Sequence, residues 1–144
     1  MELKKIGAAI TAALLCTTAS VAAELTFASG LATSHSVETF GGAELMACVE
    51  ERSAGDITFN YFPTGQLVST SNAVEGLEQG LADIAFVAPV GQSAKLPLTG
   101  LALIPGMGGS AVEMAAAFRE VLDGENPISN EIRNLGLRPL TVIS

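Results

Sequence analysis

The spacing of hydrophobic residues changes along the chain, and each spacing predicts a different kind of element. Residues 57–62 alternate between apolar and polar side chains for most of their length, which predicts a strand with one face more buried than the other. A short strand is expected to begin at residues 25–28, and residues 37–53 between the two carry apolar side chains at helical spacing. Ser36 is the expected N-cap of this helix. The expected apolar side comprises Phe40, Ala43 and Ala47, with Leu45, Cys48 and Val49 beside them.

The next helix signal follows a turn that contains proline and glycine. Asn72 is expected to cap it, with Glu75 completing a pair similar to a capping box. Its apolar stripe is made of Val74, Leu77 and Leu81. We expect this stripe to pack on the sheet. The continuous apolar run at residues 84–87 is typical of a central parallel strand buried on both faces.

The second half of the chain repeats the alternation of strand and helix signals. Residues 98–104 and 137–143 are apolar stretches that predict two more strands. Residues 110–122 and 128–135 predict two helices, and the glycines that follow them are expected to end them.

Strands separated by helices of this length imply βαβ units. The predicted fold class is therefore α/β, with a mainly parallel sheet flanked by helices. The carboxyl ends of parallel strands lie along one edge of a sheet, where ligands usually bind. The loops expected at that edge are residues 30–36, 63–70 and 88–94.

Residues 1–23 have the three-part pattern of a secretory signal peptide. Two lysines precede an almost unbroken apolar run at residues 6–15, and small residues follow where a signal peptidase cuts. The apolar run is too short to span a bilayer as a stable helix. We therefore predict export by a Sec-type signal, cleavage after Ala22 or Ala23, a periplasmic location and no membrane insertion of the mature residues 24–144.

The charge of the chain restricts its partners. The formal net charge of −8 becomes −9 without the signal, which contains two lysines and one glutamate. So acidic a chain argues against nucleic acid, because phosphates need basic residues to neutralise them, and against docking on anionic lipid. Cys48 is the one cysteine left after cleavage, and its apolar helical neighbours favour burial over a reactive thiol.

Residues suited to catalysis or metal binding are sparse. His35 is the sole histidine, and although serines flank it, no Gly-x-Ser-x-Gly elbow is present. A role in lining a pocket or capping a helix is favoured over catalysis. One histidine and one mature cysteine cannot form a common zinc set, and the acids show no calcium-loop spacing. We predict no catalytic residue, no metal and no cofactor.

One glycine-rich motif leaves a second function open. Gly106, Gly108 and Ala111 fit G-x-G-x-x-A ahead of a helix, where backbone amides can reach a phosphate. A nucleotide fingerprint normally lies in the first βαβ unit, whereas this motif lies late in the chain. The alternative is a nucleotide-dependent α/β enzyme domain using residues 106–111; otherwise the segment is a loop with a helix N-cap at Ser110.

Residues 62–89 read FPTGQLVSTSNAVEGLEQGLADIAFVAP and resemble the solute-binding proteins of TRAP transporters (tripartite ATP-independent periplasmic transporters, DctP type). That family reads as a strand, Pro-x-Gly/Ser-Gln-Leu-Gly, a helix with Glu-x-Leu-x-x-Gly, then x-Asp-Ile/Met and an apolar strand. The matching residues are Phe62, Pro63, Gly65, Gln66, Leu67, Leu77, Gly80, Asp83 and Ile84. The resemblance extends to VEERSAGDI at 49–57, LTFASGLATSH at 25–35 and LPLTGLALIP at 96–105, and so spans residues 24–143.

The resemblance implies a periplasmic-binding-protein-like fold, of which this chain supplies the first lobe only. Family members are longer two-lobed clamps that capture a small organic acid and deliver it to TRAP membrane permease subunits. By position, the residues expected to face the ligand are Gly30, Leu31, Thr33, His35, Ala88 and Pro89. The family's carboxylate-binding arginine has no counterpart here, because Arg138 precedes the last predicted strand rather than following it.

Three hypotheses for the function follow. The chain stops at Ser144, inside or just after an apolar stretch, which favours a fragment of a longer protein. The main hypothesis is a non-catalytic periplasmic receptor for a small organic acid, truncated to most of its first lobe. The alternatives are the nucleotide-dependent enzyme domain and a non-functional remnant whose sheet edge is left open.

Overall fold

A three-stranded parallel sheet organises residues 22–103 and 109–143, the parts of the chain that the computed structural model describes. Its strands are β1 (Ala23–Ala28), β2 (Ile57–Phe62) and β3 (Ile84–Ala85), in the order β2-β1-β3. The predicted α/β class with a parallel sheet is confirmed, and β2 has the bounds predicted for it.

The first strand, β1, lies in the middle of the sheet. Ala28 pairs with Phe62 on one side and with Ala85 on the other. The prediction of a doubly buried central strand at residues 84–87 is wrong, because β3 is a two-residue edge strand and these residues are half-buried. Ile84 and Ala85 pair with Phe27 and Ala28, the last two residues of β1. The residues after Ala85 therefore have no further residue of β1 to pair with.

The first helix begins with an irregular turn. A π-helical turn, η1 (Glu38–Gly42), leads into α1 (Ala43–Arg52), which confirms the predicted helix. The predicted N-cap is wrong, since Ser36 lies within the helix. The amide of Val37 donates instead to Nδ1 of His35, 3.2 Å away. His35 therefore caps this helix, which is one of the two roles favoured for it from the sequence.

Of the apolar side predicted for this helix, only Leu45 and Val49 are half-buried, and the prediction is wrong for the other four residues. Phe40 is 77 % exposed, and Ala43, Ala47 and Cys48 are exposed as well. A π-helical turn contains more than the 3.6 residues of an α-helical turn, so η1 rotates the following side chains away from the positions that an α-helical pattern assigns. The free thiol of Cys48 therefore faces solvent, against the prediction that it is buried.

The second helix, α2 (Ala73–Glu78), packs through its buried face. The predicted cap at Asn72 is wrong. Its backbone, at φ −116° and ψ 10°, is not extended as an N-cap requires, and its side chain makes no capping bond. The predicted packing of the stripe on the sheet holds for Leu77, which packs against the cluster that includes Ala28 of β1. Val74 is buried instead with Leu96, Leu122 and Ile132, and Leu81 lies beyond the end of the helix and is exposed.

A short 3-10 helix, η3 (Thr99–Leu103), stands where a strand is predicted at residues 98–104, the last of which lies outside the described residues. The carboxylate of Glu131 accepts hydrogen bonds from the amides of Leu98 and Thr99, at 2.8 and 2.9 Å, and from the Thr99 hydroxyl at 2.5 Å. These bonds occupy amides through which a strand would pair. The strand prediction is wrong because a distant side chain takes the backbone donors.

The two helices predicted in the second half are confirmed as α3 (Ala111–Asp123) and α4 (Pro127–Asn134). Ser110 caps α3 as predicted: its Oγ accepts from the amide of Glu113 at 3.3 Å, and the Glu113 carboxylate accepts from the Ser110 amide at 2.7 Å. Gly136, just after α4, has a φ of +74°, a left-handed conformation that ends helices.

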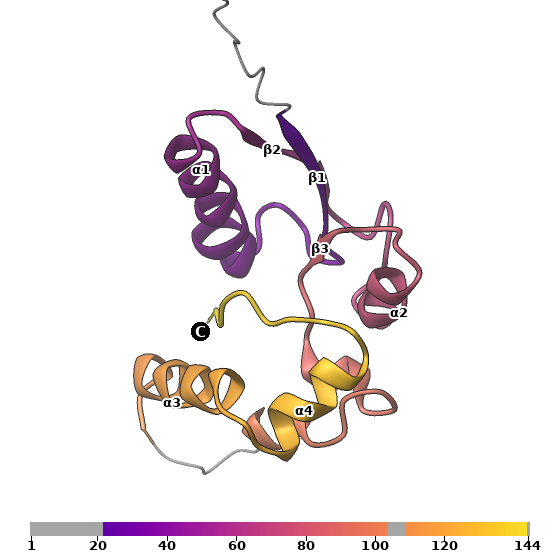
Figure 1. The fold of residues 1–144 in the computed structure, drawn as a ribbon, viewed down its shortest axis with the longest axis vertical. Helices are drawn as coiled ribbons and strands as arrows, with labels where there is room; N and C mark the ends of the chain where they lie inside the picture. The colour runs from indigo at the N-terminus through magenta and orange to yellow at the C-terminus, as the bar shows by residue number, and fades with distance from the viewer. Residues whose placement is uncertain (1–21, 104–108, 144) are drawn as a thin grey trace, which may run out of the picture.

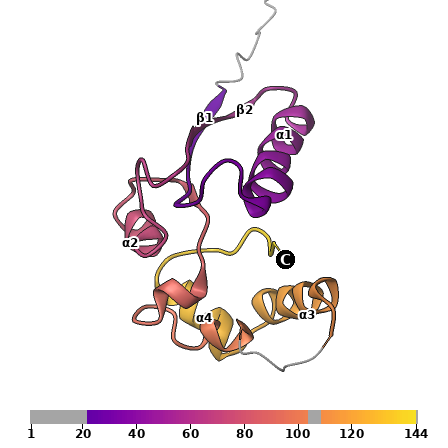
Figure 2. The same ribbon diagram turned by 180° about the vertical axis from the view of Figure 1, so that it is seen from behind.

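The prediction of a final strand at residues 137–143 is wrong, because the segment forms no strand. The amide of Leu137 donates back to the carbonyl of Ile132 at 3.3 Å, and Pro139 has no N–H to donate. Within the described residues, β1, β2 and β3 pair only with one another. Figures 1 and 2 show the segment crossing between the sheet and α3.

The described residues form a sheet region, residues 22–87, and a helical region, residues 88–103 and 109–143. One apolar cluster lies within the sheet region and is built on Ala28, Val68, Ala73 and Ala82. A second is built on Leu96, Leu122 and Ile132 of the helical region together with Val74, which α2 contributes. The half-buried Val87 packs against both and connects them.

The ribbon views show how these regions are arranged. α1 and α2 lie on either side of the strands, while α3 and α4 lie together beyond the end of the sheet (Figures 1 and 2). Among residues 22–103 and 109–143, no helix is long and apolar enough to cross a membrane.

Candidate functional site

The loops that follow the first two strands lie together at one edge of the sheet, as the parallel arrangement requires. The amide of Thr64 donates to the carbonyl of Leu31 at 2.8 Å, and the amide of Gly65 donates to the carbonyl of Ser29 at 2.9 Å. Backbone hydrogen bonds thereby fasten the first loop to the second.

The loop after the third strand is fastened to the second by Gln92. Its buried side chain donates from Nε2 to the carbonyl of Thr70 at 2.7 Å. Thr70 also packs closely against the first loop, where a Cβ on Gly30 would lie 2.3 Å from the Thr70 backbone nitrogen. Residue 30 therefore has to be glycine in this conformation, and Thr70 contacts both neighbouring loops.

The six residues predicted to face a ligand divide between this edge and a cavity. They are Gly30, Leu31, Thr33, His35, Ala88 and Pro89. Gly30 and Leu31 are half-buried in the fastened loops, and Thr33 and His35 are exposed. Ala88 and Pro89 line a cavity of about 660 Å³, and the other four residues are not part of its wall. The structure thus gathers the first four in one loop and places the last two in the wall of the cavity.

This cavity lies between the sheet and the C-terminal segment, and its size is within the range of small-molecule sites. Its walls are mostly apolar and include Phe27, Leu45, Val74, Phe118, Leu122 and Ile132. Its polar and charged lining residues are Glu38, Asp83, Thr99, Arg138 and Thr141. An apolar space with a few polar groups suits binding of a small molecule better than proton transfer to or from one.

Glu38, a buried acid in the cavity wall, was not among the residues predicted from the sequence. It is 3 % exposed; its Oε1 accepts a hydrogen bond from Oγ of Ser29 at 2.5 Å, and its Oε2 accepts one from the hydroxyl of Tyr61. The sequence offers one signal only, an acid in the first turn of a predicted helix, where acids are common on exposed surfaces.

The hydroxyl of Tyr61 remains a hydrogen-bond donor over the physiological pH range. Burial, together with the hydrogen bond to Glu38 and the charge of that carboxylate, raises the pKa of Tyr61 well above its usual value. The ring of Phe27 packs on that of Tyr61, with 5.5 Å between centroids and 49° between planes. The donor to Glu38 is therefore fixed in both protonation and position.

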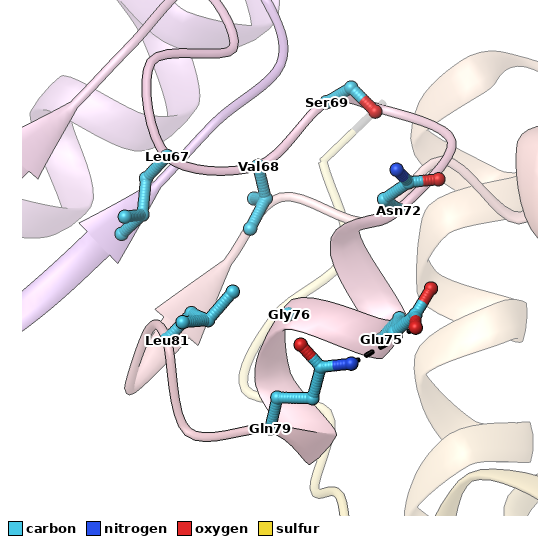
Figure 3. Close-up of a pocket in the computed structure, with 8 residues that line it drawn as sticks. All are labelled: Leu67, Val68, Ser69, Asn72, Glu75, Gly76, Gln79 and Leu81. Carbon is cyan, nitrogen blue, oxygen red and sulfur yellow. Dashed lines mark hydrogen bonds between the residues drawn. The ribbon is translucent and has the colours of Figure 1, made fainter.

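A second, more open hollow of about 310 Å³ lies beside α2, as Figure 3 shows. It is lined by Leu67, Val68, Ser69, Asn72, Glu75, Gly76, Gln79 and Leu81. Nε2 of Gln79 donates to Oε1 of Glu75 at 3.0 Å, so two of its polar side chains are bonded to each other. The hollow contains none of the predicted site residues and no basic side chain, so we do not assign it the ligand.

The remaining sequence hypotheses fall partly outside the described residues. In residues 22–103 and 109–143, no three His, Cys, Asp or Glu side chains are close enough to hold a metal ion. Gly106 and Gly108 of the nucleotide motif lie outside these ranges, and Ala111 is the first residue of α3. The signal peptide lies outside them as far as residue 21.

The comparison with protein families covers most of the chain. Residues 27–144 match the family described as bacterial extracellular solute-binding protein, family 7. A comparison with curated proteins found no match.

Solved structures are similar in fold. A TRAP periplasmic solute-binding protein from Desulfovibrio salexigens DSM2638 is 21 % identical, with a TM-score of 0.69 over 78 % of this chain and 34 % of its own. One from Sulfitobacter sp. NAS-14.1 with bound β-D-galacturonate is 22 % identical, with a TM-score of 0.60 over 78 % and 36 %. A marine metagenome TRAP solute-binding protein specific for aromatic acids, in complex with metahydroxyphenylacetate, is 20 % identical, with a TM-score of 0.69 over 78 % and 35 %.

These similarities confirm the periplasmic-binding-protein-like fold expected for the chain, as part of a longer fold. The chain matches about a third of the length of each of the three proteins.

Proposed function

Because the chain belongs to family 7 of the bacterial extracellular solute-binding proteins, we propose that it forms part of a periplasmic receptor that captures a small organic acid for uptake by a TRAP transporter. The match of residues 27–144 to that family carries this proposal. Two of the similar proteins hold acids, β-D-galacturonate and metahydroxyphenylacetate, which supports an acid as the ligand class. In this function the chain binds its ligand and hands it to membrane permease subunits without changing it.

The ligand lies, in this proposal, at the carboxyl edge of the sheet. Gly30, Leu31, Thr33 and His35 face it from the first loop, and Ala88 and Pro89 face it from the third loop, where they also line the cavity. Three loops fastened by Thr70 and Gln92 give this edge a fixed shape, which favours binding because little chain has to be ordered by the ligand.

The charge of an acid has to be met from outside these three loops. Residues 29–36, 63–70 and 86–94 contain no lysine or arginine. The similar proteins are about three times as long as the part matched here, so another part of such a receptor can supply a basic side chain and the opposite wall. An arginine there would hold the carboxylate through two parallel hydrogen bonds.

The mature chain starts, in this proposal, at Ala23. Ala23 is the first residue of β1, and its amide donates to the carbonyl of Asp56 at 2.7 Å. Cleavage after Ala22 keeps Ala23 and its hydrogen bond to Asp56, whereas cleavage after Ala23 removes both.

Thermal unfolding of the chain from Ala23 tests the proposal. The ligand panel is galacturonate and metahydroxyphenylacetate, each paired with an uncharged counterpart, galactose and 3-hydroxyphenylacetamide. A ligand that binds at this edge stabilises the fold by about 2.7 kcal/mol at 100 times its Kd. Because the three loops contain no basic side chain, the acid and its uncharged counterpart are expected to stabilise this chain to similar extents. No stabilisation by any of a wider set of carboxylates contradicts binding by this chain.

A pair of alanine variants locates the binding. Ala88→Asp places a carboxylate at the proposed ligand edge and is expected to abolish stabilisation by an acid. Ala47→Asp adds the same charge at an exposed position of α1, outside the three loops, and is expected to leave it largely intact. Equal loss in both variants means that net charge, and not the position of residue 88, decides binding.

A further inference from the structure

Glu38 is a buried acid without a basic partner among the described residues, whose two ion pairs lie elsewhere. A buried carboxylate is costly unless hydrogen bonds replace the water it has lost. Both of its oxygens accept such bonds, from Ser29 and from Tyr61. Glu38 is therefore a hydrogen-bond acceptor fixed at one place in the fold, and its effect depends on which segments its donors belong to.

The hydroxyl of Ser29 connects Glu38 to the first loop. It donates to Oε1 of Glu38 at 2.5 Å and accepts the amide of Leu31 at 3.1 Å. Ser29 is fully buried, and its backbone carbonyl accepts the amide of Gly65. The carbonyl of Leu31 in turn accepts the amide of Thr64. A continuous set of hydrogen bonds therefore runs from Glu38 into the loop and across to the next loop.

The other side of the carboxylate is fixed by β2 and by the π-helical turn. The Tyr61 hydroxyl donates to Oε2 of Glu38. A Cβ on Gly42 would lie 2.9 Å from the same oxygen, so the glycine in η1 leaves room for the carboxylate. The acid is held between three elements, whereas the loop it reaches is otherwise exposed at Thr33 and His35.

We infer that Glu38 is a positioning residue: anchored by Tyr61, it fixes Ser29 and thereby holds the loop at residues 30–35 in the conformation that receives the ligand. The reference to a ligand rests on the proposed function; the fixed conformation of the loop does not. An acid that only stabilised the fold as a whole would affect all regions alike. An acid that positions this loop affects the loop first.

Amide hydrogen exchange, measured by NMR on the chain from Ala23, separates these two roles. We expect Ser29→Ala and Glu38→Ala to speed exchange at the Leu31 and Thr64 amides roughly tenfold, because the bonds that hold the loop are lost. Exchange at the amide of Asn130, which donates to the carbonyl of Asn126 at the start of α4, changes less than about twofold. Ser34→Ala, an exposed serine in the same loop, is the matched control and leaves both amides unchanged.

Glu38→Gln supplies the rescue. Its side-chain oxygen still accepts from Ser29 and its amide group can donate to Tyr61, so exchange at Leu31 returns close to the wild-type rate. Equal acceleration at Leu31 and Asn130, or unchanged exchange at Leu31, overturns the positioning role. Should Glu38→Ala fail to fold, Ser29→Ala and Tyr61→Phe decide the question by the same comparison.

Ligand affinity provides a second readout. If the wild-type chain binds an acid, Glu38→Ala is expected to weaken binding about tenfold while Glu38→Gln preserves it. An affinity that is unchanged in Glu38→Ala overturns the link between the loop and the ligand. If the wild-type chain binds no acid, the proposed function fails, and the exchange rates still decide whether Glu38 positions the loop.

Discussion

Each region has one glutamate that fixes a nearby segment through hydrogen bonds, Glu38 in the sheet region and Glu131 in the helical region. The surroundings of the two side chains differ. Glu38 is buried and accepts bonds from two side-chain hydroxyls. Glu131 is partly exposed and accepts two backbone amides and one hydroxyl. Partial burial raises the pKa of Glu131, but its bonds from Thr99 and Leu98 together outweigh this and lower that pKa below its usual value.

The difference indicates how each region responds to a lost contact. Water can replace part of what Glu131 provides, because its carboxylate is still hydrated. Water cannot easily reach Ser29 or Glu38, so a displaced group there remains without a partner. Substitutions at the loop edge of the sheet region should therefore destabilise most, and those around Glu131 least.

The largest effect is expected at the contact between the first two loops. Gly30→Ala places a methyl group against the Thr70 backbone, which cannot move without disturbing two loops, and should lower the free energy of unfolding by about 3 kcal/mol. Gly100→Ala is the matched control, since no heavy atom lies within 4 Å of its Cβ position. Urea unfolding at neutral pH measures both; equal effects would show that the tight contact is not a constraint.

An intermediate effect is expected in the apolar cluster of the helical region. Leu122 is 5 % exposed, and Leu122→Ala should lower the free energy of unfolding by about 2 kcal/mol, the low end for such a change, because the side chain already borders a cavity. Val112→Ala on the same helix, where the side chain is 74 % exposed, should change it by less than about 0.5 kcal/mol. Similar losses in both variants would contradict the assignment of Leu122 to the core.

The smallest effect is expected for Glu131→Gln. The neutral amide keeps one acceptor oxygen but loses the charge, so we expect a loss of about 1 kcal/mol at pH 7, measured by urea unfolding. Because the pKa of Glu131 is lower in the folded than in the unfolded chain, its contribution is present above the usual carboxyl range and disappears as pH falls through the folded pKa. The difference between wild type and variant should therefore shrink between pH 7 and pH 3.

Glu125→Gln is the control for this pH dependence. Glu125 is exposed, and no hydrogen bond or ion pair involves its side chain within the described residues. Its substitution should leave the wild-type pH dependence intact. A difference at Glu131 that stays constant down to pH 3 would mean that its charge does not contribute.

The elements that could be predicted from the sequence are those decided by near neighbours. The alternation in residues 57–62 and the turn residues after it are local, and β2 has the predicted bounds. Ser110 and Glu113 are three residues apart, and their capping box forms as expected. The parallel pairing of the strands also predicts that the first two loops lie at one edge, as their hydrogen bonds confirm.

The features that could not be predicted are decided by residues far apart in the chain. The apolar run at 98–104 has a strand pattern, but Glu131 takes its amides from more than 30 residues away. Glu38 finds its partners 9 and 23 residues away, and nothing in its own turn distinguishes it from an exposed acid. The cavity that includes Ala88 and Pro89 depends on how the two regions pack, which no single segment encodes.

The order β2-β1-β3 also has a consequence for how the chain is made. The strand that needs a neighbour on both sides is the first to leave the ribosome, and its second neighbour, β3, follows about 60 residues later. Until both neighbours are in place, one or both edges of β1 are open to pairing with another chain. Quality control during biogenesis therefore has one short segment to shield, Ala23–Ala28, until the residues that close it have been made.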